Sequence, residues 1–253
     1  MIKRAKSFQI GTFFFNNRAI SNHFAILFRN FAPSKQTIFL MKTFKAALFD
    51  LDGTLFDTEG QYSVFWGKTC RRFRPDIDRL EYKIKGMTLV QIFDTYFPDP
   101  EVQAIITEGL NQWEMQMHYD WVPGAEEFIM DCRRHGVKCA VITSSNQMKM
   151  KAVAAQRPHF NDLFERNLTS EDFSASKPAP DCYLLGAKVF GLDISECVVF
   201  EDAINGLQAG MASGIFTIGL TTTNDPAVVA QLSHHVINDF TKLDYEKVCE
   251  LLN

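Results

Sequence analysis

Short apolar runs alternate with longer amphipathic stretches along most of the chain. Continuous short apolar runs indicate strands that are buried on both faces, as in a parallel sheet. The runs that we assign to such strands are residues 44–49, 137–142, 197–200, 215–220 and 235–237. Helical segments separate these runs from residue 121 onward. The pattern therefore predicts an α/β fold with a Rossmann-like, doubly wound parallel sheet as its core.

Between the first two runs the pattern is helical throughout. Two sets of apolar residues recur there at the three- and four-residue spacing of amphipathic helices. The sets are Leu89, Ile92, Phe93, Tyr96 and Phe97, followed by Val102, Ile106, Leu110, Trp113 and Met117. We expect an all-helical cap of four helices at residues 59–120, inserted into a core formed by residues 41–58 and 121–253.

The first forty residues differ in composition from the rest of the chain. They contain several Lys and Arg residues, and no acidic residue occurs before Asp50. Such a segment is typical of an organellar transit peptide, but an upstream translation start with Met41 as the alternative start explains it more simply. We expect residues 1–40 to be a poorly ordered extension, and the location to be cytoplasmic, with an organellar location as the alternative.

Composition and charge narrow the class of protein. At 253 residues and 46% hydrophobic content, the chain can bury a sizeable core. A net charge of -4 provides no general basic field for nucleic acid or an anionic membrane, and no apolar run approaches the ~20 residues that span a bilayer. The six cysteines form no C-x-x-C pair, which favours a reduced set without chemistry. We expect a monomer or weak homo-oligomer with a small-molecule partner.

Three polar segments follow predicted strands, at the edge where doubly wound sheets bind ligands, and a fourth lies in a later loop. The four polar segments are Asp50-Leu51-Asp52-Gly53-Thr54, Thr143-Ser144-Ser145-Asn146, Lys177-Pro178 and Glu201-Asp202. In this order and spacing, the chain from about residue 44 to residue 240 resembles the haloacid dehalogenase-like superfamily. The resemblance is to the branch with a helical cap after the first motif, which includes sugar phosphatases and β-phosphoglucomutase. Each segment alone is a weak signal, but the combination is specific.

The resemblance implies four catalytic residues. Asp50 is expected to attack phosphorus and form an aspartyl-phosphate, and Asp52 to serve as the acid and then the base, since two carboxylates beside Mg²⁺ can divide this labour. Lys177, in a loop stiffened by prolines, would neutralise phosphoryl charge. Thr143 would bind phosphate oxygens, although a threonine before Ser-Ser-Asn is equally a helix-capping pattern.

The expected cofactor is Mg²⁺, which prefers oxygen ligands. The ligands would be Asp50, the main-chain carbonyl of Asp52, Asp202 and, directly or through water, Glu201. Two acidic residues at the start of a helix also have a simpler explanation, a favourable interaction with the helix dipole.

Four further residues are candidates for substrate binding. Gly53 would let the main chain approach the phosphate, and Ser144 and Asn146 would contact phosphate near the start of a helix. Lys85 lies in the cap loop that we expect to select the leaving group. A lone lysine in a loop is otherwise most often a solvated surface residue.

These residues predict an Mg²⁺-dependent phosphatase for a small soluble phosphomonoester, such as a sugar phosphate. Asp52 argues against the dehalogenases, which lack the second aspartate. A β-phosphoglucomutase-like mutase remains an alternative, but Leu89 and Tyr62 stand where that family carries arginine and histidine, and residues 86–132 contain no Lys or Arg. An inorganic pyrophosphatase and, less favoured, a non-catalytic binding protein on the same scaffold also remain open.

Overall fold

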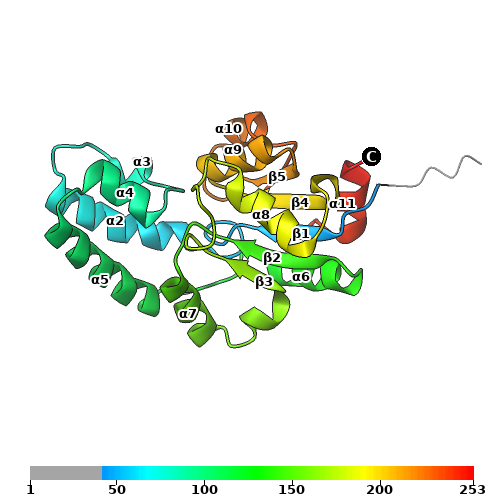
Figure 1. Cartoon of the computed structure of the whole chain (residues 1–253), viewed down its shortest axis with the longest axis horizontal. Coiled ribbons are helices and arrows are strands. Elements are labelled where there is room, and N and C mark those ends of the chain that lie inside the picture. Colours follow the sequence, from blue (N-terminus) through cyan, green and yellow to red (C-terminus); the bar gives the residue numbers. More distant parts are fainter. Residues whose placement is uncertain (1–41) are drawn as a thin grey trace, which may run out of the picture. The chain divides into compact units, whose positions relative to one another are not determined.

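A computed structural model describes residues 42–253, so the predictions for residues 1–40 lie outside the described residues. Six parallel strands form one sheet in the order β3-β2-β1-β4-β5-β6 (Figure 1). The strands are β1 (Ala46–Phe49), β2 (Lys138–Ile142), β3 (Arg166–Leu168), β4 (Cys197–Glu201), β5 (Phe216–Leu220) and β6 (His235–Ile237). This arrangement confirms the predicted α/β class with a Rossmann-like parallel sheet.

Ten helices accompany the sheet in the described part of the chain. Those that pack on the sheet or beside it are α6 (Ala125–Arg134), α7 (Gln147–Gln156), α8 (Asp181–Phe190), α9 (Ile204–Ser213), α10 (Pro226–Gln231) and α11 (Tyr245–Leu251). Those between β1 and α6 are α2 (Glu59–Phe73), α3 (Leu80–Lys83), α4 (Leu89–Tyr96) and α5 (Pro100–Gln116). Short 3-10 turns lie at Phe160–Leu163 and Ile194–Glu196. None of the described helices is long and apolar enough to cross a membrane.

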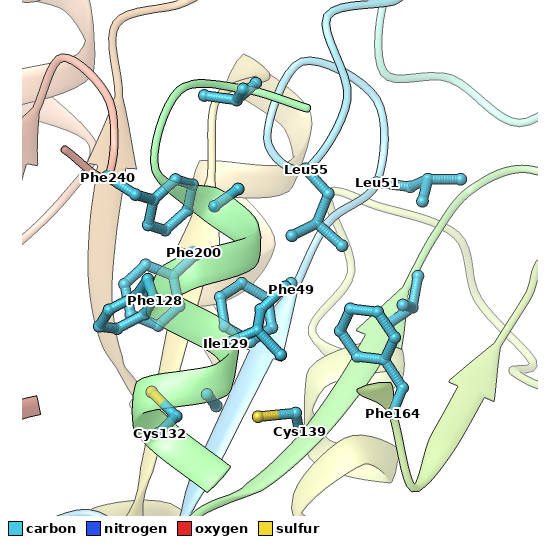
Figure 2. Packing of buried hydrophobic residues seen from close by; sticks show 14 of the residues in the cluster. Phe49, Leu51, Leu55, Phe128, Ile129, Cys132, Cys139, Phe164, Phe200 and Phe240 are labelled. Carbon is cyan, nitrogen blue, oxygen red and sulfur yellow. The ribbon is translucent and has the colours of Figure 1, made fainter. Parts of the chain in front are cut away.

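Strand β1 lies in the middle of the sheet, and helices pack against both of its faces. Ala47 and Phe49 belong to a hydrophobic cluster with α6 and α11, whereas Ala46 and Leu48 belong to another with α8 and α9. Neighbouring strand residues point to opposite faces, so four consecutive apolar residues serve both layers. On the α6 side, the rings of Phe49 and Phe200 stack with centroids 4.8 Å apart (Figure 2). The next residue after β1, Asp50, is thereby held at the carboxyl edge.

The predicted strands are correct in place, but one strand was missed. Strand β3 is a three-residue edge strand, Arg-Asn-Leu, without the apolar run that marks a buried strand. The observed strands β1, β2 and β5 also begin one or two residues later than predicted, and β4 extends by one residue to Glu201. That last difference follows from pairing, because Glu201 lies opposite Gly219 of β5. A charged residue at a strand end breaks an apolar pattern without ending the hydrogen-bonded ladder.

The four helices α2–α5 form the inserted segment that we call the cap. It is joined to the core by two linkers that run side by side: the N–H of Asp57 donates to the carbonyl of Asp120 (2.9 Å), and the N–H of Val122 donates to the carbonyl of Leu55 (2.8 Å). The cap has a hydrophobic cluster of its own. Placing the boundaries at residues 59 and 120 remains a proposal.

The cap also contacts the core at the start of α4. Thr88 caps this helix in a reciprocal box with Gln91, which satisfies main-chain donors of its first turn. The same two side chains reach the loop before α8. The Oγ atoms of Ser176 and Thr88 are 3.3 Å apart, and Nε2 of Gln91 donates to the carbonyl of Lys177 at 3.2 Å. The cap and the core therefore meet beside Lys177, the predicted catalytic lysine.

We expect the aromatic cluster under β1 to dominate the stability of the core. Phe128 of α6 is buried and lies against the rings of Phe200 and Phe240, with centroid distances of 5.2 and 5.4 Å. Phe128→Ala should lower the free energy of unfolding by about 3–5 kcal/mol, because it leaves a cavity that the ring stack cannot fill. Urea unfolding measures the difference. Met130→Ala, on the exposed side of the same helix, should stay within ~0.5 kcal/mol of the native chain, and equal losses would contradict the prediction.

Candidate active site

The predicted nucleophile lies at the bottom of the site, directly after β1. The carboxylate of Asp50 is almost fully buried, and its Oδ1 accepts a hydrogen bond from Nζ of Lys177 at 2.6 Å. Oδ2 accepts from the N–H of Asp52 at 3.0 Å. The sheet brings β4 next to β1, which places Glu201 and Asp202 beside Asp50 although they follow it by about 150 positions in the chain. Three acidic side chains therefore share one buried site.

Lys177 is held in place by a set of acceptors. Its Nζ lies 2.6 Å from Asp50, 2.7 Å from Oε2 of Glu201 and 3.2 Å from the carbonyl of Ile142. Burial acts to lower the pKa of Lys177, but the two carboxylates outweigh it and raise the pKa well above its ordinary range. The hydroxyl of Tyr183 donates to the same Glu201 oxygen at 2.6 Å. Lys177 is therefore a fixed, permanently charged ammonium.

Glu201 uses both of its oxygens within the protein. Oε2 accepts from Lys177 and Tyr183, and Oε1 accepts from the N–H groups of Asp202 (3.1 Å) and Ala203 (2.9 Å). A carboxylate has about four acceptor positions. Its main structural contribution is thus to hold Lys177.

Asp202 is bound by hydroxyl groups from two loops. Oδ1 accepts from Thr54 at 2.7 Å, and Oδ2 accepts from Thr223. The space next to Gly53 is taken by this carboxylate: a Cβ atom there would lie 2.2 Å from Oδ2 of Asp202, and φ is +84°. Gly53 is not among the residues that line the cavity. Glycine is therefore needed here to admit Asp202, and the predicted approach of the Gly53 main chain to phosphate stays a prediction.

The three carboxylates form a suitable site for a hard divalent cation. Oxygen atoms of Asp50, Glu201 and Asp202 lie within 4.8 Å of one another, and all three residues are buried. Desolvation and then repulsion from Glu201 raise the pKa of Asp50 to about 7, and the same causes raise that of Asp202 well above its ordinary value. One ammonium does not balance three carboxylates, so an added cation would relieve the repulsion. Oxygen-only donors match Mg²⁺.

Asp52 has surroundings of a different kind. Its Oδ1 accepts from the hydroxyl of Thr58 at 2.6 Å and from Nζ of Lys149, and its Oδ2 accepts from the hydroxyl of Ser145 at 3.1 Å. Lys149 was not predicted. The signal for it is that a basic residue in the first turn of a helix opposes the helix dipole and so needs a local anion. Lys149 occupies that turn of α7 and is fully buried.

The segment from Thr143 to Asn146 connects β2 to α7. Oγ1 of Thr143 accepts from the N–H of Ser145 at 3.0 Å, and Oδ1 of Asn146 caps α7 by accepting from the N–H of Lys149 at 3.0 Å. Asn146 is therefore the residue of this segment that caps helix α7. The hydroxyl of Ser144 is buried without a hydrogen-bond partner among the described residues. Thr143, Ser144 and Asn146 all line the cavity, so each lies where it could contact a ligand.

A cavity of about 130 Å³ lies between these residues and the cap. Apolar groups and acidic side chains form its cap side. The lining residues that carry charge there are Glu59, Glu81, Lys85 and Glu114. Lys85, a predicted substrate ligand, pairs with Oε2 of Glu59 at 3.0 Å. The positive charge of Lys85 is therefore already balanced by the carboxylate of Glu59.

Comparisons with known proteins agree on the family and the fold of this chain. A family model described as haloacid dehalogenase-like hydrolase matches residues 47–220, which is more than half of the chain. Hexitol phosphatase A of Escherichia coli (strain K12) is 30% identical over 196 residues, covering 72% of this chain and 85% of that protein. The solved β-phosphoglucomutase of Clostridium difficile matches with a TM-score of 0.71 at 21% identity, covering 83% of this chain and 98% of the other. At that identity, the likeness shows a shared fold alone.

Two plant proteins match over only part of their own length. Protein SUPPRESSOR OF QUENCHING 1, chloroplastic, from Arabidopsis thaliana is 30% identical over 204 residues, which are 77% of this chain and 19% of that protein. The bifunctional riboflavin kinase/FMN phosphatase from the same plant is 28% identical over 214 residues, which are 82% of this chain and 56% of that protein. This chain therefore spans about a fifth of one and just over half of the other.

The raised pKa of Asp50 predicts how the metal-free protein responds to pH. Its pKa is 3.8 ordinarily and about 7 in the folded chain, so the folded state holds the extra proton between these values. Stability contributed by this proton is complete below pH ~4 and is lost as the pH rises through ~7. With chelator present, the free energy of unfolding should therefore be lower at pH 7.5 than at pH 5 by about 1 kcal/mol or more, and the thermal midpoint should fall with it.

Mg²⁺ should raise the midpoint most at the upper end of this range, because the cation replaces the proton. Asp50→Asn should flatten the slope in chelator, whereas Asp162→Asn, at an exposed position, should leave it unchanged. A midpoint that rises with pH in chelator would contradict the assignment.

Proposed function

The chain belongs to the haloacid dehalogenase-like hydrolase family, and we propose that it is an Mg²⁺-dependent phosphatase that acts on a small phosphorylated metabolite through an aspartyl-phosphate on Asp50. The observation that carries this proposal is the buried Asp50–Lys177 pair at the carboxyl edge of the sheet, 2.6 Å apart, with a second aspartate two residues on. Fold alone would not support an activity, since one scaffold hosts many functions. The arrangement of these side chains does.

In the first half-reaction, a carboxylate oxygen of Asp50 forms a bond to phosphorus while the bond to the leaving oxygen breaks. Asp52 gives its proton to that oxygen, so the product leaves as an alcohol. Lys177 would face the phosphoryl oxygens from its fixed position and offset their charge. Thr143 and the main-chain N–H groups after it would bind the remaining oxygens.

In the second half-reaction, water attacks phosphorus and the bond to Asp50 breaks. Asp52 takes the proton from this water, which returns it to the protonated state in which it began. Mg²⁺, when held by Asp50, Asp202 and the main-chain carbonyl of Asp52, would supply positive charge to the phosphoryl oxygens. Glu201, whose oxygens already accept from four donors, would reach the cation through water at most.

The charge of the cap favours hydrolysis over mutase chemistry. A mutase must hold a second phosphate away from the reacting one, which needs a free cation. Of the residues that line the cavity, only Lys85 and Lys177 are basic, and both are paired with carboxylates. Glu81 and Glu114 add negative charge on the cap side. We infer that the leaving group is uncharged and hydroxylated, as in a sugar or polyol phosphate.

The acidic cap also bears on pyrophosphate and on a purely binding role. Pyrophosphate would present an anionic leaving group to this acidic wall, so inorganic pyrophosphatase activity is disfavoured. A non-catalytic binding role would not need the buried pair of Asp50 and Lys177. A small phosphorylated metabolite is therefore the proposed partner. A cytoplasmic location stays a prediction, with an organellar location as the alternative that a relative described as chloroplastic supports.

Phosphate release from a panel of phosphorylated metabolites tests the proposal. The native chain with Mg²⁺ should release phosphate from at least one sugar or polyol phosphate, and chelator should abolish the release. Asp50→Asn should lower kcat by about 10⁴-fold or more, the contribution of covalent catalysis and acid–base transfer together. Asp162→Asn should match the native chain. Isomerisation of glucose 1-phosphate with a bisphosphate primer, without release, would instead establish the mutase.

The acidic cap predicts discrimination against a second negative charge. Glycerol 1-phosphate and 3-phosphoglycerate differ at one end by a hydroxymethyl group against a carboxylate. The kcat/KM for the second should be at least about tenfold lower, which corresponds to ~1.4 kcal/mol. Glu81→Gln should bring the kcat/KM values of the two substrates closer together. Glu108→Gln, at an exposed position of the cap, should leave their ratio unchanged. Equal kcat/KM values in the native chain would count against an electrostatic role of the cap.

A further inference from the structure

The buried ammonium of Lys149 has no part in the mechanism above, and we propose that Lys149 is a positioning residue for Asp52. It would hold the carboxyl group of Asp52 in the orientation that reaches the leaving oxygen. This inference rests on the proposed phosphatase function, in which Asp52 transfers the proton.

Lys149 is fully buried at the start of α7. Lysine is among the residues least often buried, and an unpaired ammonium inside a protein is costly. Its Nζ forms an ion pair with Oδ1 of Asp52, which is its only hydrogen bond to a side chain in the described part of the chain. The one carboxylate that pairs directly with this ammonium is therefore the group that the proposed mechanism uses for proton transfer.

Three donors hold the carboxylate of Asp52, and they come from three parts of the fold. Thr58 precedes the first cap helix, Ser145 lies in the loop after β2, and Lys149 is in α7. Only Lys149 is charged, and charge-assisted hydrogen bonds are about twice as strong as neutral ones. Loss of either hydroxyl would leave the charged partner in place, whereas loss of Lys149 would leave Asp52 with two neutral hydrogen bonds and a weaker hold on its orientation.

Lys149 also connects Asp52 to the cap. Its Nζ lies 4.4 Å from the centre of the Tyr62 ring, within cation–π distance. The hydroxyl of Tyr62 donates in turn to Oε1 of Glu114 at 2.7 Å, which joins α2 to α5. The C-terminal end of helix α5 lies next to α7 (Figure 1). The cap thus fixes the far side of the ammonium while Asp52 fixes the near side.

A purely structural ion pair and a positioning residue differ in their effect on leaving groups. Proton transfer matters for an alkyl alcohol, which is a poor leaving group, and hardly matters for p-nitrophenolate, which departs without a proton. The kcat/KM reports the steps up to departure of the leaving group, so slow hydrolysis of the aspartyl-phosphate does not disturb the comparison. A misplaced Asp52 should therefore slow alkyl phosphates selectively.

The experiment measures kcat/KM of the full chain with Mg²⁺ for glycerol 1-phosphate and p-nitrophenyl phosphate. Lys149→Met should lower the first by about 100-fold, the scale of a misplaced catalytic group. It should lower the second less than about threefold, because no proton is needed. Lys151→Met, two positions on and exposed, should change neither. Equal losses for both substrates would overturn the inference and leave the hydrolase function standing.

A double-mutant cycle makes the test specific to Asp52. If Lys149 acts through Asp52, then Lys149→Met should have little further effect on glycerol 1-phosphate turnover in the Asp52→Asn chain. Additive losses would overturn the inference. Lys149→Gln, which keeps a hydrogen-bond donor without the charge, serves in the same cycle if Lys149→Met does not fold. Absence of phosphate release by the native chain would count against the phosphatase function, and with it against this role.

Discussion

Crowding of buried negative charge at one edge of the sheet is the constraint on which the rest of the structure depends. Asp50, Glu201 and Asp202 place carboxylate oxygens within 4.8 Å of one another, and bare burial of such a set would be strongly unfavourable. The surrounding residues can be understood as responses to it. Lys177 neutralises part of the charge, main-chain N–H groups and the Tyr183 hydroxyl bind Glu201, and two threonines bind Asp202. The remaining negative charge is what makes the site fit for a divalent cation.

The sheet creates this crowding, and the hydrophobic layers offset its energetic cost. Strands β1 and β4 are adjacent, so chain segments that are far apart in sequence end side by side. Their apolar residues pack against helices on both faces, and the rings of Phe49 and Phe200 stack on each other (Figure 2). These two residues directly precede Asp50 and Glu201 in the chain. Dense packing of this kind resists the small movements that would let the carboxylates separate. The core thus provides the rigidity that the proposed reaction would need.

The two aspartates of the first motif lie two residues apart and meet different environments. Asp50 faces other carboxylates and Lys177, whereas Asp52 faces two hydroxyls and Lys149. Groups with opposite tasks in one site are commonly separated in this way by their surroundings. Lys149 reaches across to Tyr62, so the difference between the two carboxylates extends into the cap. The cap would then influence the chemistry as well as the choice of leaving group.

The sequence by itself determined the class of fold and the parallel sheet, because apolar runs are local patterns. Its resemblance to a known family singled out Asp50, Asp52, Thr143, Lys177 and Asp202 as the candidate set. It could not determine β3, whose three residues carry no such pattern, or that the carboxylate of Asp202 occupies the space beside Gly53. Lys149 shows the limit most clearly. Along the chain it is one of two lysines in α7, 97 positions from Asp52. Only the packing of α7 against the cap buries it, and a buried ammonium must find a carboxylate, so the tertiary structure alone decided its partner.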